Sequence, residues 1–136
     1  MKIRSLSLGP VFFVLTVGVA PCMGEVNEVD NNFDGKIDTW QYVNAQGKIE
    51  KAEYDEDFDG KVDRIDHFKG EKTLERVEFD KNKDGNMDHI QYYANGGKLV
   101  RTETSTKLDG KFDWKDFYDS NNNRTRSEID AVEGAG

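Results

Sequence analysis

The sequence has few of the residues that usually hold a small protein together. It contains one cysteine, Cys22, and two prolines among 136 residues. A single cysteine cannot form an intramolecular disulfide, so a disulfide-stapled fold is excluded. The mean hydropathy of −0.83 approaches that of chains that bury too little apolar surface to offset the entropy of ordering. We therefore expect the fold to depend on something besides a large hydrophobic core, and metal often takes that role in small proteins without disulfides.

Long hydrophobic runs are also scarce. The main one, residues 11–19, follows Lys2 and Arg4 and is too short to span a bilayer stably. This arrangement is typical of a secretory signal peptide. We expect residues 1–24 to be the signal peptide and residues 25–136 to be one mature domain without a transmembrane segment. The expected location is secreted or cell-surface, in the periplasm or outside the cell.

The processing site leaves two alternatives. Cys22 follows Val19, Ala20 and Pro21, which looks like a bacterial lipoprotein site except that Pro21 stands where Gly or Ala is usual. In this first interpretation, Cys22 is the site of a lipid anchor. In the other interpretation, cleavage near Gly24 leaves a mature chain with no cysteine.

Positive charge is in short supply. The chain has 19 Lys and Arg against 27 Asp and Glu, and removing the leader takes away Lys2 and Arg4 but no acid. The mature chain therefore carries a net charge of about −10. This charge disfavours binding to nucleic acids and to anionic membranes.

An acidic nonapeptide recurs at a fixed interval of 25 residues. Its four copies, the first to fourth loops, span residues 30–38, 55–63, 80–88 and 105–113. The pattern D-x-[DN]-x-D-G places oxygen-bearing side chains at positions one, three and five, and Gly at position six allows the turn that directs them to one point. The pattern predicts calcium loops in the first three copies. In the fourth loop Ser105 and Lys107 replace two acidic ligands, which favours a capping turn over a metal site.

The first three loops resemble those of the EF-hand calcium-loop superfamily, particularly the secreted bacterial forms related to dockerins. The resemblance implies side-chain ligands at positions one, three and five, a backbone carbonyl at seven, a ligand often acting through water at nine, and a carboxylate at twelve. Position twelve holds Gln41, Asp66 and Gln91 in place of the usual Glu, so the residue that closes each site stays open. The candidate ligands are Asp30, Asn32, Asp34, Lys36 (carbonyl) and Asp38; Asp55, Asp57, Asp59, Lys61 (carbonyl), Asp63 and Asp66; and Asp80, Asn82, Asp84, Asn86 (carbonyl) and Asp88.

Oxygen-only ligands favour calcium over zinc or copper, and a flexible loop with many ligands favours calcium over magnesium. We expect about three Ca²⁺ ions. The alternative is a set of metal-free turns, since Asp, Asn and Gly also build turns through their own hydrogen bonds. Three copies in register favour metal, because four clustered aspartates in the second loop would otherwise repel one another.

The segments between the loops predict strands. Sixteen residues separate one nonapeptide from the next, too few for two helices, and residues 64–68, 74–79 and 89–93 are rich in β-branched and aromatic residues in short alternating runs. We expect an all-β fold, an antiparallel meander or hairpin solenoid of about four 25-residue repeats, with a thin core and the calcium loops along one edge. A column of glutamates is expected at solvated strand positions rather than as extra metal ligands: Glu28, Glu53, Glu78, Glu103 and Glu128.

No catalytic set emerges, since His67 and His89 lie on different columns without a Cys or second His at ligand spacing. We expect a non-enzymatic, secreted calcium-binding protein in which calcium is structural, acting as an interaction module for an extracellular protein or glycan. One alternative is a dockerin-like scaffold partner with helices after its loops. Another is a polysaccharide-active enzyme that uses acidic residues.

Overall fold

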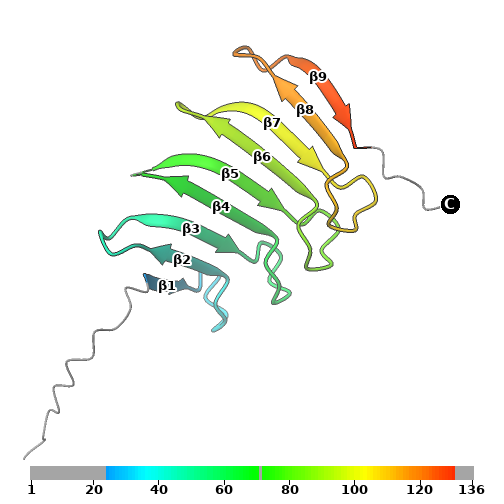
Figure 1. Cartoon of the computed structure of the whole chain (residues 1–136). Coiled ribbons are helices and arrows are strands. Elements are labelled where there is room, and N and C mark those ends of the chain that lie inside the picture. Colours follow the sequence, from blue (N-terminus) through cyan, green and yellow to red (C-terminus); the bar gives the residue numbers. More distant parts are fainter. Residues whose placement is uncertain (1–23, 71, 131–136) are drawn as a thin grey trace, which may run out of the picture.

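The computed structural model describes residues 24–70 and 72–130 and forms one antiparallel sheet (Figure 1). Each strand pairs with its neighbours in sequence, from β1 at one edge to β9 at the other, and the sheet stays open. This confirms the predicted all-β antiparallel meander. The strands are β1 (Glu25–Val29), β2 (Thr39–Val43), β3 (Ile49–Tyr54), β4 (Arg64–Lys69), β5 (Thr73–Phe79), β6 (His89–Ala94), β7 (Lys98–Thr104), β8 (Trp114–Tyr118) and β9 (Arg124–Ile129).

The predicted leader and Cys22 lie outside the described residues, apart from Gly24. Within residues 24–70 and 72–130, no helix is long and apolar enough to cross a membrane.

Long and short connections alternate, so the four acidic loops all lie at one end of the strands and the short turns at the other (Figure 1). A meander forces this separation because every second connection returns to the same end of the sheet. Strands β2, β4, β6 and β8 each carry a register shift near the short turn, after Tyr42, His67, Tyr92 and Phe117. These shifts recur every 25 residues, and such irregularities bend and twist a strand locally.

The core is thin, as expected from the composition. In the described part of the chain, three hydrophobic side chains are buried: Ala52, Val77 and Ile90. Ala52 and Val77 pair with Asp66 from either side in the middle of the sheet. Within residues 24–70 and 72–130 no second layer covers this sheet (Figure 1), so most aromatic side chains there are only half-buried. Tertiary packing alone therefore contributes little stabilisation per residue.

One face of the sheet carries a ladder of ion pairs. A basic residue and a glutamate two positions later share this face on alternate strands, starting at β3, and they lie 2.7 Å apart for Lys51 and Glu53 and 3.3 Å apart for Arg101 and Glu103. Of the glutamates predicted at solvated positions, Glu28 and Glu128 at the two edges of the sheet are exposed, whereas Glu53 and Glu103 side chains are only 18% and 14% exposed. The prediction is wrong for these inner glutamates because the basic residue and the neighbouring strand cover each carboxylate.

Aromatic rings complete the ladder from the adjacent strand. The Lys51 ammonium lies 3.8 Å from the centre of the Tyr42 ring, and the Arg101 guanidinium lies 4.0 Å from that of Tyr92. The Tyr42 hydroxyl also donates to Glu53 at 2.7 Å. Each basic group is thus held by both a carboxylate and a ring, an arrangement worth about 0.5–1 kcal/mol for the ring contact at an exposed site.

Replacing Val77 tests how much the thin core contributes. Val77 is 2% exposed, so Val77→Ala removes two buried methyl groups and should lower the free energy of unfolding by about 2 kcal/mol. Val100→Ala makes the same chemical change at a side chain that is 38% exposed and should cost less than about 1 kcal/mol. Urea unfolding followed by circular dichroism measures both, and equal losses would contradict a core centred on Val77.

The buried histidine predicts a pH dependence. Burial, helped by the charge of Lys81, lowers the pKa of His89 from 6.5 to about 4, and its Nδ1 lies 2.8 Å from Thr104 Oγ1. The unfolded chain therefore takes up a proton that the folded chain does not, and stability present in full above about pH 6.5 is lost as the pH falls toward 4. His89→Gln should flatten the melting temperature across this window in chelator-containing buffer. An unchanged pH profile would contradict the assignment.

Candidate metal centre

The side chain at position one organises each of the four loops. In the second loop, Asp55 Oδ1 accepts from the Asp59 amide at 3.1 Å and Oδ2 accepts from the Gly60 amide at 2.8 Å. The chain reaches these bonds through two residues with positive φ, Phe58 at 65° and Gly60 at 93°. Position six is glycine because this backbone conformation is strained for other residues. Asp30 accepts the same pair of amides in the first loop, at 3.2 and 2.8 Å.

The next two acidic positions form nested turns. Asp57 Oδ1 accepts from the Asp59 amide at 3.3 Å, and Asp59 Oδ1 accepts from the Lys61 amide at 2.8 Å. Asp side chains commonly bond their own backbone two residues on. These bonds within the loop fix the side-chain directions at positions three and five.

The carboxylate at position nine is fixed from below by the sheet. The Asp63 amide donates to the Tyr54 carbonyl at 2.8 Å, and the Asp63 carbonyl accepts from the Asp80 amide at 2.8 Å, so the β-ladder continues into the loop base. The Asp63 residue is 5% exposed. Its Oδ2 accepts from the amides of Glu56 and Asp57 at 2.8 and 3.1 Å. The position-nine side chain is therefore a rigid, buried acceptor beneath the loop.

Three of the predicted ligands in the second loop converge. One oxygen from each of Asp55, Asp57 and Asp63 lies within 4.8 Å of the others. Calcium–oxygen bonds of about 2.3–2.6 Å let two ligands on opposite sides of one ion lie about 5 Å apart. The spacing therefore fits a single metal ion, and the oxygen-only donor set suits a hard cation.

The position-twelve candidate lies elsewhere. Asp66 belongs to β4 and is 5% exposed. Arg64 donates to both of its oxygens, from Nε at 2.7 Å and from Nη2 at 2.9 Å. The structure thus places Asp63, and not Asp66, with the converging oxygens. Asp59 also stands outside the group of three.

The first and third loops repeat the turn with an amide at position three. Asn32 accepts from the Asp34 amide at 2.9 Å, and Asn82 accepts from the Asp84 amide at 3.2 Å. The position-seven amides of Lys36 and Asn86 donate to position five at 2.9 and 2.8 Å, as in the second loop.

The position-nine carboxylate of the first loop is well satisfied. Burial alone would raise the pKa of Asp38, but hydrogen bonds from Asn31 and Thr39 outweigh it and hold that pKa below its ordinary value. Its Oδ2 accepts from the Asn31 amide at 2.8 Å.

Asp88 differs from its counterparts at position nine. It is 0% exposed, and neither Oδ1 nor Oδ2 has a hydrogen-bond partner. In the same loop Asp80 Oδ1 accepts from the Lys83 amide at 2.7 Å. A buried carboxylate without a donor is costly unless a cation compensates it. A hard cation in the third loop would supply that compensation, so the residues present fit such an ion.

The fourth loop keeps the turn without an acid at positions one and three. Ser105 Oγ accepts from the Asp109 amide at 3.1 Å, and Leu108 has φ of 54°. Asp113 accepts from the Thr106 amide at 2.8 Å. This backbone therefore forms without a carboxylate at position one, which supports the capping-turn interpretation.

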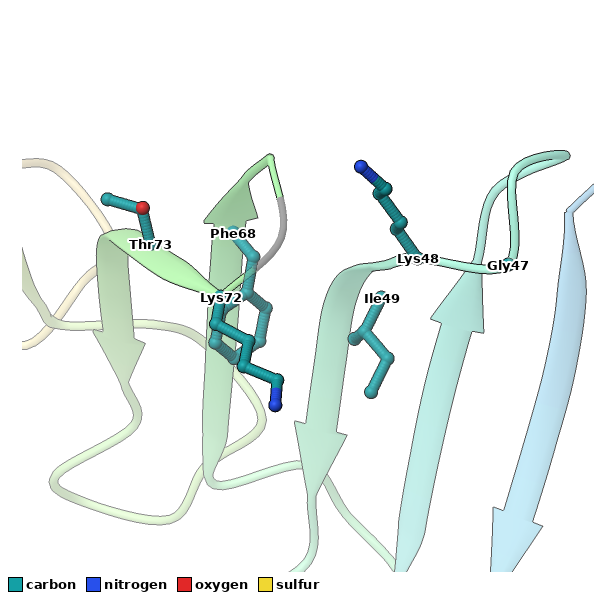
Figure 2. Close-up of a pocket in the computed structure, with 6 residues that line it drawn as sticks. All are labelled: Gly47, Lys48, Ile49, Phe68, Lys72 and Thr73. Carbon is teal, nitrogen blue, oxygen red and sulfur yellow. The ribbon is translucent and has the colours of Figure 1, made fainter.

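A pocket of about 610 Å³ lies away from the acidic loops (Figure 2). It sits at the short-turn end of the sheet and is lined by Gly47, Lys48, Ile49, Phe68, Lys72 and Thr73. These residues include two lysines and no carboxylate, so they offer no cation site.

The comparisons with known proteins do not identify the chemistry of the loops. No protein-family model and no curated protein matches the chain. Among solved structures, part of the chain is similar to a protein in the crystal structure of a GtfA/B complex, with 19% identity and a TM-score of 0.49. The match covers 67% of this chain and 16% of that one.

Because Asp88 is unpaired and Asp63 is paired, the same Asp-to-Asn change should alter stability in opposite directions at the two positions. Asp88→Asn should raise the free energy of unfolding in EDTA by about 1 kcal/mol or more, because it removes an uncompensated buried charge, and should reduce stabilisation by calcium. The matched change Asp63→Asn weakens an acceptor of two amide hydrogens and should lower stability in EDTA by about 1–2 kcal/mol. Denaturant unfolding with and without calcium separates the two. Asp88→Asn destabilising the chelated protein would count against this view.

Proposed function

We propose that this chain is a secreted calcium-binding repeat protein in which about three Ca²⁺ ions hold the acidic loops and so stabilise the sheet. The convergence of Asp55, Asp57 and Asp63 oxygens within 4.8 Å carries the proposal. The buried, unpaired carboxylate of Asp88 supports it independently from another loop. The metal is calcium because the donors are oxygens on an adaptable loop that can offer six or more of them.

Calcium of ordinary extracellular affinity is enough to matter for this fold. Extracellular modules bind with Kd of about 10⁻⁴–10⁻³ M. At free calcium about ten times Kd, each independent site adds about 1.4 kcal/mol. Three sites then add about 4 kcal/mol, comparable with the whole stability of a marginal domain. The thin core leaves room for a contribution of this size.

The proposed location follows from the leader-like residues 1–24, with an anchor at Cys22 as the alternative. The proposed role is an extracellular interaction module for a protein or glycan, because both faces of the single sheet are open to contact (Figure 1).

Calcium titration calorimetry on the purified protein tests the proposal. About three sites are expected. Asp34→Asn, Asp59→Asn and Asp84→Asn, each at position five of one loop, should each remove or weaken one site because that side chain is a predicted ligand and the acceptor that orders position seven.

The control is Asp109→Asn, at position five of the fourth loop, which should leave the stoichiometry unchanged. EDTA should lower the melting temperature of the wild-type protein. Calcium and magnesium are then added back separately, and calcium should restore the melting temperature more fully than magnesium does. Binding heat indistinguishable from dilution, or a melting temperature insensitive to EDTA, would falsify the proposal.

A further inference from the structure

The side chain at position four of a loop reaches toward the preceding loop. Phe58 of the second loop lines a cavity of about 160 Å³ together with Asp34, Asp38 and Trp40 of the first repeat. Phe33 has no preceding loop in the described chain and is 89% exposed. Stacking of the loops at the sheet edge therefore brings position four of one copy over the acids of its neighbour.

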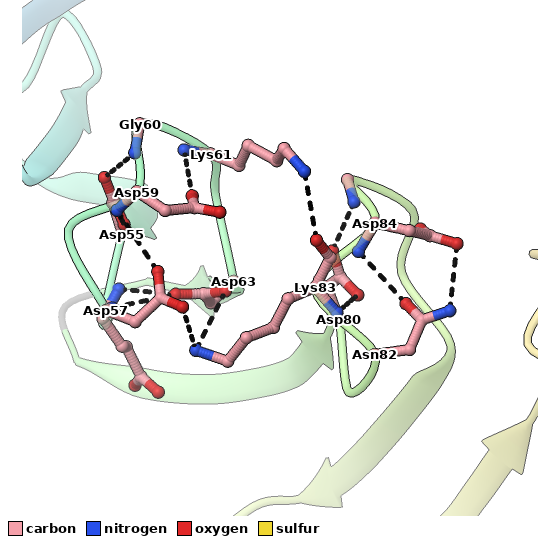
Figure 3. Close-up of polar contacts among 12 residues, drawn as sticks. Asp55, Asp57, Asp59, Gly60, Lys61, Asp63, Asp80, Asn82, Lys83 and Asp84 are labelled. Atoms are coloured by element: carbon pink, nitrogen blue, oxygen red, sulfur yellow. Dashed lines mark hydrogen bonds and ion pairs between the residues drawn. The ribbon is translucent and has the colours of Figure 1, made fainter.

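In the third loop this position is a lysine. The Lys83 ammonium lies 2.5 Å from Asp57 Oδ2 and 3.8 Å from Asp63 Oδ1 (Figure 3). Both carboxylates belong to the converging group of the second loop. The other oxygen of Asp63, Oδ2, accepts hydrogen bonds from two amides, so Oδ1 faces the ammonium.

A second lysine holds Lys83 in place. Lys61 of the second loop donates from Nζ to the Lys83 carbonyl at 3.1 Å (Figure 3). The Lys61 side chain also packs on the third loop, since a Cβ at Gly85 would lie 3.9 Å from Lys61 Cδ. Each of the two loops thus extends a lysine side chain to the other loop, and Lys61 holds the Lys83 backbone in place.

We propose that Lys83 is a tethered counter-cation of the second loop, which holds Asp57 and Asp63 together without metal and must leave before a divalent cation binds there. This inference rests on the proposed calcium binding. The ammonium contacts oxygens that would ligate the ion, and two cations cannot share them because like charges a few ångströms apart repel strongly. Lys83 therefore lowers the calcium affinity of the second loop while it stabilises the metal-free fold.

Site-resolved calcium titration by NMR tests this role in the whole protein. The amides of Gly35, Gly60 and Gly85 report one loop each, because each donates to the position-one carboxylate. Lys83→Met keeps an unbranched side chain, one atom shorter, and removes the charge, so the Gly60 midpoint should move to about 3- to 10-fold lower calcium while the Gly35 midpoint stays. The melting temperature in EDTA should fall by about 1–4 °C, the range for losing an exposed ion pair.

Two controls make the result specific. Lys81→Met makes the same charge change in the same loop, at a lysine whose charge acts on His89, and should leave the Gly60 midpoint within about twofold. Lys83→Arg keeps the charge and should behave like the wild type. A Gly60 midpoint that is unchanged or raised in Lys83→Met, while calcium still shifts the amides, overturns the role of Lys83 alone. If calcium shifts none of the three amides in the wild type, calcium binding and this inference fall together.

Discussion

The hydrogen bonds that the position-one side chain accepts from amides within its own loop set the geometry on which the sheet depends. In the second loop Asp55 closes this turn, and the chain then re-enters the sheet at Asp63, whose amide bonds the Tyr54 carbonyl. A nine-residue connection of fixed shape fixes the register of the two strands it joins. Because the same connection recurs every 25 residues, the same columns of side chains meet on every strand pair. The loops are therefore structural determinants as well as candidate metal sites.

That register explains how a single-layer sheet holds together with three buried hydrophobic side chains in its described part. Aligned columns let Lys51 contact both Glu53 on its own strand and Tyr42 on the next. Each such contact contributes a fraction of a kcal/mol, but it recurs along the sheet, as in other repeat proteins whose stability sums over neighbouring units. Loops that splay apart would misalign these columns. Stabilising a loop, by metal or by a lysine, therefore stabilises the strands beside it.

The sequence was sufficient for the strands and for the shape of the loops, since alternation and D-x-[DN]-x-D-G are local signals. Features that depend on register were missed. Glu53 and Glu103 are examples, because the basic residue two places earlier, Lys51 or Arg101, and the paired strand together cover them. The position-twelve spacing of a helical family predicts Asp66 as a ligand. In this chain a strand follows the loop, so the three residues after Asp63 carry Asp66 into the sheet, where Arg64 binds its carboxylate. No local pattern points to Lys83, because its carboxylate partners lie one repeat away.

The distribution of charge among the loops gives that lysine its significance. The second loop has five acidic residues and one lysine, a net charge of −4, whereas the third has three acids and two lysines, a net charge of −1. A loop with excess carboxylates offers the strongest attraction for a divalent ion and suffers the greatest repulsion without one. A monovalent cation tethered from the next repeat relieves the repulsion when calcium is scarce, yet it is too weakly charged to equal a divalent ion among the same oxygens. The third loop, with Asp88 buried and unpaired, has no such relief in the described structure. The two neighbouring loops therefore meet the same electrostatic demand in different ways, the second with a lysine that metal must displace and the third with a carboxylate that only a cation would satisfy.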